Sequence, residues 1–415
     1  MTGLPRIGVV YDVGAVGIVD IASALQGVAE PVFICPDSRH ISQPRDLMAE
    51  FGILCDIVGL AAIEAADRTR KHNLAGILTF SDYQLELTAQ LAALLKLPFN
   101  TLSSVRALTR KHVQRELLNA VGASDAPTRL VTDAGSAWKA LHRIGLPAVL
   151  KPDHGTGSRS TYRIRTREDL GRACAELFGE GSGQGAAEAF VLEAEIRGAT
   201  LDWPWGDYVS VESAVQDGQF RHLATTGKFP LAEPYRETGS FLPAALPADL
   251  HRQVLSVVTR ALTALQAGQG LCHTEVKLTP DGPQVIEVNG RLGGRVQELL
   301  AQSMGINAIE LAARIALGEA GAMDVLPDTP YSIAFLYASV PPIGATRLLS
   351  VQGTDELQRK PEISRVILHQ KDGTELDWRR GQLSNTYVCY GSVATHDELA
   401  RVIAGIGDTV EVIYE

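Results

Sequence analysis

The chain of 415 residues is 45% hydrophobic and 21% charged, with a formal net charge of −10. Its length predicts two or three packed domains, and its acidic balance argues against a nucleic-acid or anionic-membrane partner, which requires a basic face. The five scattered cysteines form no C-x-x-C pair and no apolar run approaches the roughly 18 residues of a membrane span, so we expect a cytoplasmic protein.

The first hundred residues alternate short apolar runs with stretches of helix length. The expected strands are 6–12, 31–37, 55–60 and 75–82, and the expected helices are 15–27, 44–51, 61–73 and 83–96. This alternation predicts a doubly wound parallel sheet with helices on both faces. The segment GAVG at 14–17 lacks a full G-x-G-x-x-G pattern, so a tight strand-to-helix turn is favoured over a nucleotide site.

The rest of the chain changes character twice. Strand and helix continue to alternate up to the hinge-like segment that ends at 198, and alternating apolar and polar residues beyond it predict antiparallel strands. The further expected helices are 103–121, 249–267, 295–317 and 396–404, with a glycine-rich surface loop at 179–187. The predicted domains are 1–102, 103–198, 199–325 and 326–415, the last being a mixed α+β segment.

A predicted hairpin carries the main chemical signal. The turn Pro280-Asp281-Gly282 brings Glu275 opposite Glu287, because the two residues are nearly equidistant from the turn. Asn289 and Arg291 follow Glu287 at intervals of two residues and therefore share its strand face. Two carboxylates and an amide oxygen suit Mg²⁺, and a neighbouring guanidinium can meet the charge of a transferring phosphoryl group.

A second signal lies at 147–164, PAVLKPDHGTGSRSTYRI. Lys151 ends an apolar strand, and a loop rich in glycine and serine follows it directly. Backbone N–H groups of such a loop can hold phosphate oxygens while the lysine supplies a positive charge. The segment lacks the G-x-x-x-x-G-K-[ST] pattern, which excludes a P-loop nucleotidase.

Four segments, in this order, together resemble the ATP-grasp superfamily. They are Lys111, the K-P-x-x-G-x-G-S segment from Lys151, FVLEAEIRG at 190–198, and E-x-K-L…I-E-V-N-x-R-x-G-G at 275–294. The resemblance implies an ATP-grasp fold of combined α/β and α+β class. Two lobes would clasp ATP between an N-terminal parallel-sheet domain and a C-terminal mixed segment, with ATP and Mg²⁺ (or Mn²⁺) as cofactors.

The resemblance also implies a role for individual residues. The residues implied to bind ATP are Lys111, Lys151, Gly155, Gly157, Ser158, Glu193, Ala194 and Ile196, the last three forming the hinge whose backbone holds adenine. The implied metal ligands are Glu275, Glu287 and Asn289, and the implied catalytic residues are Arg291 and Lys151. Thr200 stands where many members have an acidic ribose contact, and Asp202 is its expected substitute.

Within the superfamily, the stretches at 201–220, 225–247 and 270–294 are most similar to the L-amino-acid ligases, which make dipeptides. The similarity implies an enzyme that joins one amino acid to another through an acyl phosphate and releases ADP and phosphate. The implied substrate residues are Glu237, Ser240 and Arg295, with Ser240 standing where relatives often carry histidine. Small-molecule amino acids are the expected partners, and a homodimer is left open.

Two other functions remain as alternatives at this stage. One is a biotin-carboxylase-like subunit that phosphorylates bicarbonate, although the chain has no A-M-K-M biotin-attachment sequence. The other is a non-catalytic nucleotide-binding module, which has no need of the full set of lysines, carboxylates and Arg291. No side chain identifies itself as the general base, and His273 beside the metal hairpin is an open candidate.

Overall fold

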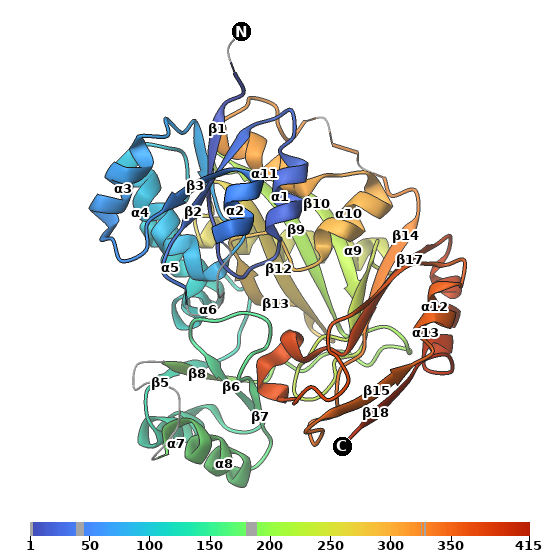
Figure 1. The fold of residues 1–415 in the computed structure, drawn as a ribbon. Helices are drawn as coiled ribbons and strands as arrows, with labels where there is room; N and C mark the ends of the chain where they lie inside the picture. The colour runs from blue at the N-terminus through green and yellow to red at the C-terminus, as the bar shows by residue number, and fades with distance from the viewer. Residues whose placement is uncertain (1–2, 39–44, 180–188, 325, 328) are drawn as a thin grey trace.

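The structure, a computed structural model, describes residues 3–38, 45–179, 189–324, 326–327 and 329–415. The described strands form four sheets (Figure 1). Because the rest of the predicted glycine-rich loop at 179–187 lies outside the described residues, only its first residue is placed, where Gly179 ends a helix.

The N-terminal sheet is parallel, in the order β3-β2-β1-β4, as the sequence predicted. Its strands are β1 (Arg6–Val10), β2 (Glu30–Cys35), β3 (Ile53–Asp56) and β4 (Gly76–Leu78), and its helices are α1 (Ile18–Ala24), α2 (Arg45–Phe51), α3 (Ala62–Arg70) and α4 (Leu85–Leu95). One sheet face packs on α3 and α4, and the other packs on α1, α2 and a later helix pair. The third strand was predicted too late in the chain, since residues 57–60 form a turn before α3.

The GAVG segment is a tight turn. The Ala15 amide donates to the Phe80 carbonyl at 2.9 Å, and a Cβ on Gly14 would lie only 2.2 Å from that carbonyl oxygen. Only glycine permits this close approach of two backbones.

The predicted helix at 103–121 is wrong as a single helix. It is divided into α5 (Leu102–Thr109) and α6 (Lys111–Ala120) by Arg110, whose backbone is extended. The cause is a distant cap: the Lys111 amide donates to the Asp153 carbonyl and the His112 amide to the Asp153 carboxylate, both at 2.9 Å. A helix start satisfied by a residue some forty positions later leaves no local signal.

A small antiparallel sheet follows, in the order β5-β8-β6-β7. Its strands are β5 (Thr128–Val131), β6 (Ala148–Pro152), β7 (Tyr162–Ile164) and β8 (Phe190–Ala194), and its helices are α7 (Ala134–Ile144) and α8 (Arg167–Phe178). Both helices bury apolar residues against the sheet in a core separate from the others. This unit is the green lobe at the lower left of Figure 1.

The large sheet has eight strands in the order β13-β12-β9-β10-β11-β14-β17-β16. They are β9 (Tyr208–Gln216), β10 (Gln219–Lys228), β11 (Gly239–Leu242), β12 (Gly270–Thr279), β13 (Gly282–Asn289), β14 (Ile333–Ala338), β16 (Ile363–Leu368) and β17 (Tyr387–Val393). The neighbours are antiparallel, as predicted beyond residue 199. The sheet continues across the predicted domain boundary at 325–326.

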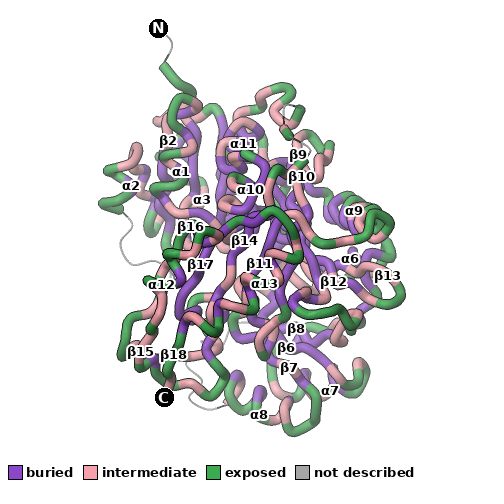
Figure 2. Tube along the Cα trace, turned by 90° about the vertical axis from the view of Figure 1, so that its right-hand side faces the viewer, coloured by how far each residue is buried: buried purple, intermediate pink, exposed green. Residues whose placement is uncertain are grey.

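Helices cover both faces of the large sheet. Helix α9 (Ala248–Ala264) packs on one face, and α10 (Val296–Met304) and α11 (Ala308–Ala316) lie on the other, between this sheet and the N-terminal sheet. The single helix predicted at 295–317 is wrong, because Gly305 adopts φ +68° and Asn307 caps a new helix by accepting from the Glu310 amide. The sheet strands are the most deeply buried part of the tube in Figure 2.

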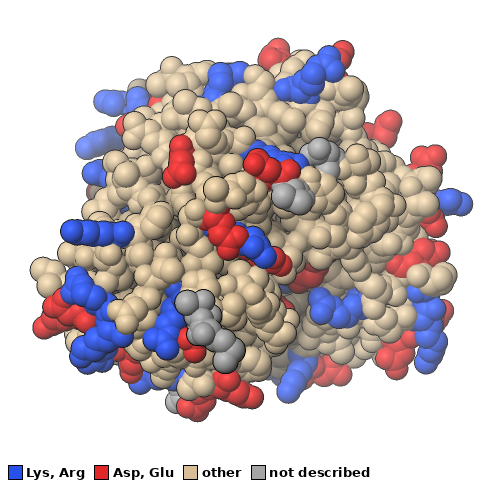
Figure 3. Space-filling view, turned by 90° about the horizontal axis from the view of Figure 1, so that it is seen from above, with Lys and Arg blue, Asp and Glu red and all other residues tan. Residues whose placement is uncertain are grey.

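The C-terminal part adds a two-stranded sheet of β15 (Leu348–Gln352) and β18 (Glu411–Tyr414), with helices α12 (Thr354–Gln358) and α13 (His396–Ile406). Two 3₁₀ segments, η1 (Asp82–Gln84) and η2 (Trp378–Ser384), lie beside the site described below. Acidic and basic side chains are interspersed over the face shown in Figure 3. Within the described ranges, no helix is long and apolar enough to cross a membrane.

Candidate functional site

A cavity of about 480 Å³ lies where the N-terminal sheet, the small sheet, the large sheet and η2 meet. Most predicted site residues line it: Lys111, Lys151, Gly155, Gly157, Ser158, Glu193, Ala194, Ile196, Glu237, Glu275, Glu287, Asn289 and Arg291. Three others do not line it: Asp202, Ser240 and Arg295. The structure therefore brings the segments of the sequence motif together around one space.

The hairpin of β12 and β13 has the predicted register. Glu275 lies directly opposite Glu287, and His273 lies opposite Asn289. A bulge follows between Glu275 and Val276, but it leaves these two pairs aligned. The carboxylates and the amide consequently face one side of the sheet and enter the cavity together.

These side chains fit a hard divalent cation. Glu275 and Glu287 offer anionic oxygens and Asn289 offers an amide oxygen, the donor chemistry that Mg²⁺ prefers. Within the described ranges, no group of three or more His, Cys, Asp and Glu residues could hold a metal by itself. A cation here would therefore take its remaining ligands from phosphate oxygens and water.

Lys111 is the first residue of α6 and reaches the hairpin. Its Nζ lies 3.3 Å from the Glu287 carboxylate and donates to the Gly155 carbonyl at 2.9 Å. Burial lowers the pKa of Lys111, but the charges of Glu287 and Asp82 outweigh burial and raise that pKa above its ordinary value. Lys111 therefore stays charged at neutral pH and lies between the β12–β13 hairpin and the glycine-rich loop at 155–160.

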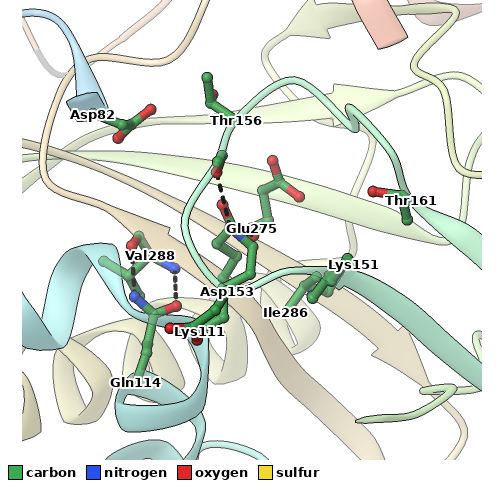
Figure 4. A network of polar contacts seen from close by, with 12 residues as sticks. Asp82, Lys111, Gln114, Lys151, Asp153, Thr156, Thr161, Glu275, Ile286 and Val288 are labelled. Atoms are coloured by element: carbon green, nitrogen blue, oxygen red, sulfur yellow. Dashed lines mark hydrogen bonds and ion pairs between the residues drawn. The ribbon is translucent and has the colours of Figure 1, made fainter. Parts of the chain in front are cut away.

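Helix α6 is fixed to the edge of the large sheet, which holds Lys111 in place. Gln114 exchanges two 2.8 Å hydrogen bonds with the backbone of Val288, visible in Figure 4, and Arg115 donates to the carbonyls of Val285 and Ile286. Strand β13 is an edge strand, so these side chains satisfy backbone groups that would otherwise be unpaired.

Lys151 at the end of β6 is buried and paired. Its Nζ lies 2.5 Å from the Glu193 carboxylate, and that carboxylate also lies 3.3 Å from the Arg115 guanidinium. Burial opposes ionisation of Glu193, but Lys151 and Arg115 outweigh it and lower its pKa. Glu193 thus holds both cations in place as well as lying on the predicted hinge strand.

Arg291 is clamped by two distant segments. Its Nη2 lies 2.7 Å from Asp82 of η1 and donates to Thr156 of the glycine-rich loop at 2.8 Å, while its Nε donates to Asp82 at 2.8 Å. Both charged partners are buried, and the pKa of Arg291 is raised because Asp82 outweighs the effect of burial. Sequence reasoning missed Asp82, although its position in the segment that follows β4, beyond the carboxyl end of a parallel strand, is typical of ligand sites.

His273 lies between two carboxylates. Its Nδ1 makes a very short contact with the buried Glu212, and its Nε2 lies 3.6 Å from Glu275. Burial lowers the pKa of His273, but the charge of Glu212 outweighs burial, so the pKa is raised to about 9. The geometry and the charge of Glu212 both favour a protonated ring, with Nδ1 toward Glu212 and Nε2 toward Glu275, so a role as general base stays a prediction.

The far end of the cavity contains a second ionic group. Glu237 lies 2.9 Å from the buried Lys228 and accepts from Gln382 of η2 at 2.6 Å. Ser240 pairs with Lys228 in neighbouring strands but is covered, so a direct substrate contact stays a prediction. Asp202 is exposed and Arg295 is partly buried at the start of α10, so their roles also stay predictions.

Residues 144–298 match the family profile of the ATP-grasp domain. The chain is 25% identical over 278 residues to carnosine synthase 1 of Mus musculus, which covers 63% of this chain and 33% of that protein. It is 27% identical over 195 residues to alanine–anticapsin ligase of Bacillus subtilis (strain 168), or 44% of this chain and 41% of that protein. The matches span half or less of the length of these curated relatives.

The fold is similar to known structures over the whole chain. An L-amino acid ligase from Bacillus licheniformis superposes with a TM-score of 0.76 at 20% sequence identity, covering 100% of both chains. Biotin carboxylase from Campylobacter jejuni superposes with a TM-score of 0.64 at 14% identity, covering 99% of this chain and 92% of that one. The predicted ATP-grasp fold, with its N-terminal parallel sheet, is confirmed.

Proposed function

We propose that this chain, whose residues 144–298 form an ATP-grasp domain, is an ATP- and Mg²⁺-dependent ligase that joins a carboxylate to an amine. One observation carries the proposal: Glu275, Glu287 and Asn289 face the same cavity as Lys111 and Lys151. Oxygen ligands for a cation beside two lysines suit a triphosphate. A simple binding pocket has no need of that combination.

ATP would lie along the cavity from the hinge to Arg291. The lining residues Ala194, which ends β8, and Ile196 would supply backbone for adenine at one end. Lys111 and Lys151 would meet the phosphates in the middle, since Lys151 is buried, Lys111 is half-buried, and the present partners of both are carboxylates. Gly155 and Gly157 of the loop at 155–160 line the cavity, so their backbone N–H groups would be near the phosphates.

Glu275, Glu287 and Asn289 would hold Mg²⁺, which when bound neutralises phosphate charge. The chemistry follows from a weakness of the substrate: a carboxylate is a poor electrophile because it is anionic. Transfer of the γ-phosphoryl group of ATP to its oxygen breaks the bond to ADP and forms an acyl phosphate. A neutral amine then attacks the acyl carbon, phosphate leaves with that oxygen, and the nitrogen loses one proton to phosphate or water.

The chain's residues mainly position and stabilise these groups. Arg291 lies two residues beyond Asn289, the last residue of β13, and its guanidinium is already held by Asp82 and Thr156. It can therefore stabilise the phosphoryl oxygens without reorganising during the reaction. The buried Arg115 and Glu193 keep Lys151 in position.

Amino acids are the proposed substrates for both the carboxylate and the amine. The names of the relatives carnosine synthase and alanine–anticapsin ligase support this class. Glu237, which lines the cavity and bonds to Lys228 and Gln382, is the proposed contact for a substrate ammonium. A homodimer stays a prediction.

A phosphate-release screen over pairs of amino acids, with mass spectrometry of the products, tests the proposal. A condensed product together with ADP and phosphate is expected for at least one pair. A parallel arm with bicarbonate tests the carboxylase alternative, which the fold similarity to biotin carboxylase keeps relevant. ATP binding without turnover in either arm would favour a non-catalytic module.

A further inference from the structure

The cavity is electrostatically balanced along most of its wall. In the part of the chain that the structure describes, every carboxylate that lines it has a basic side chain within 4 Å. The six carboxylates and their partners are Asp82 with Arg291, Glu193 with Lys151, Glu195 with Arg163, Glu237 with Lys228, Glu275 with His273 and Glu287 with Lys111.

Two cations of the wall break this balance. Among the described residues, neither Arg159 nor Arg380 forms an ion pair, although both line the cavity and both are exposed at its mouth. Arg159 donates only to the Tyr83 hydroxyl, at 3.0 Å. The remaining lining lysine, Lys277, is paired with Asp207 at 2.7 Å. The mouth therefore carries two positive charges that none of the described carboxylates neutralises.

These two arginines come from backbone segments that touch. A Cβ placed on Gly381 would lie 2.0 Å from the Gly157 carbonyl oxygen and 3.1 Å from the Arg159 amide nitrogen. The Ser160 amide donates to the Arg379 carbonyl at 3.0 Å, and the Gln382 amide donates to the Gly157 carbonyl at 3.2 Å. The glycine-rich loop and η2 thus bring the backbones of Arg159 and Arg380 close together, and both residues line the same cavity.

The opening is at the reaction end of the cavity rather than at the hinge. Thr156, three residues before Arg159, contacts Arg291, and Tyr83 follows the Arg291 partner Asp82 directly. The anionic groups of ATP already have Lys111, Lys151 and a metal site deeper in the wall. An anion bound at the mouth would therefore belong to a group that approaches the acyl phosphate from outside.

We propose that Arg159 and Arg380 bind the free carboxylate of the amine-donating substrate. The inference rests on the proposed function, in which an amino acid supplies the amine. Such a substrate keeps its own carboxylate throughout the reaction, and that anion is common to the whole class. Two planar guanidinium groups recognise a carboxylate through paired N–H donors, so the site selects amino acids over simple amines or ammonia.

The test compares an amino acid with its own carboxamide as the amine donor. The carboxamide has nearly the same shape and an equally available amine, but it has no negative charge. Phosphate release would give kcat/KM for both donors with wild type, with the double variant Arg159→Gln/Arg380→Gln, and with Arg172→Gln. Arg172 is an exposed arginine of α8 whose partner is Asp169, so it controls for loss of a surface charge.

Wild type and the Arg172→Gln control should prefer the free acid by about 10- to 100-fold, the size expected for charge-assisted hydrogen bonds. The double variant should bring this preference to within about threefold of unity, with unchanged KM for ATP and for the carboxylate that is activated. An intact preference in the double variant would overturn the subsite. A raised KM for ATP with the preference unchanged would also overturn it, by assigning the arginines to the triphosphate.

The proposed function can fail separately. If wild type released no phosphate with any pair of amino acids, both the function and the subsite would be rejected. If wild type formed a condensed product but used the carboxamide as well as the acid, only the subsite would be rejected.

Discussion

Replacing Arg291 by lysine separates its role in chemistry from its role in the fold. The guanidinium makes two contacts with Asp82, one with Thr156 and one with the Leu292 carbonyl. A lysine ammonium can keep the charge beside Asp82, but a single nitrogen cannot span from Asp82 to Thr156. Arg291→Lys should therefore fold normally while losing the planar donor fork.

The size of the effect follows from when these donors matter. Negative charge develops on the phosphoryl oxygens during transfer, so the fork stabilises the transition state more than bound ATP. Loss of one such preorganised donor typically lowers kcat by about 10²–10³. We expect this decrease for Arg291→Lys, with the dissociation constant of ATP changed by less than about threefold.

Alanine at the same position is a weaker test, because it leaves the buried Asp82 carboxylate alone. Removing one partner of a buried ion pair costs about 3–5 kcal/mol of the free energy of unfolding. Arg291→Ala should therefore be both inactive and unstable, and Asp82→Asn in the same chain should recover part of the stability without recovering turnover.

The assay is steady-state phosphate release at saturating ATP, with ATP affinity from calorimetry and stability from urea unfolding. Unchanged kcat in Arg291→Lys, combined with weakened ATP binding, would make Arg291 a ground-state ligand and refute the reasoning.

Three further substitutions test other parts of the site. Glu287→Gln should abolish turnover at limiting Mg²⁺ while the protein stays folded, because an amide removes one charge from a small set of metal ligands; near-normal rates in a Mg²⁺ titration would reject the metal site. Glu193→Gln should make the free energy of unfolding less sensitive to acid. Ion pairs hold the pKa of Glu193 below its ordinary 4.5, so the ionised carboxylate stabilises the fold above that pH, and this stabilisation is lost as pH falls through the folded pKa. Urea unfolding at several pH values measures the change. Gly381→Ala should lower the free energy of unfolding more than Gly373→Ala. The Cβ at 381 would lie 2.0 Å from the Gly157 carbonyl oxygen, whereas position 373 has a positive φ but open space. Hydrogen exchange in the glycine-rich loop should rise only in Gly381→Ala, and equal effects of the two variants would show that η2 does not hold the loop.

The hairpin shows what a sequence can predict. Glu275 and Glu287 are equidistant from a strong turn, so local geometry alone brings them together, and the observed register agrees. The parallel N-terminal sheet was also predictable, because its strands and helices alternate at short range.

What the sequence could not provide depends on long-range contacts. The break at Arg110 arises because Asp153, which follows β6 of the small sheet, caps the start of α6. The helical sequence pattern on both sides of Arg110 hides this break. Asp82 contacts Arg291 across 209 residues, and Glu212 contacts His273 across 61. No local pattern marks such partners, whereas burial and distance identify them at once.

The central claim is that a carboxylate is activated as an acyl phosphate. An amino acid labelled with ¹⁸O in its carboxylate tests this claim most directly. In the proposed reaction one carboxylate oxygen attacks the γ-phosphorus and leaves with it, so each inorganic phosphate released should carry one ¹⁸O atom, in step with ADP and the condensed product. Unlabelled phosphate, or AMP and pyrophosphate in place of ADP and phosphate, would contradict it.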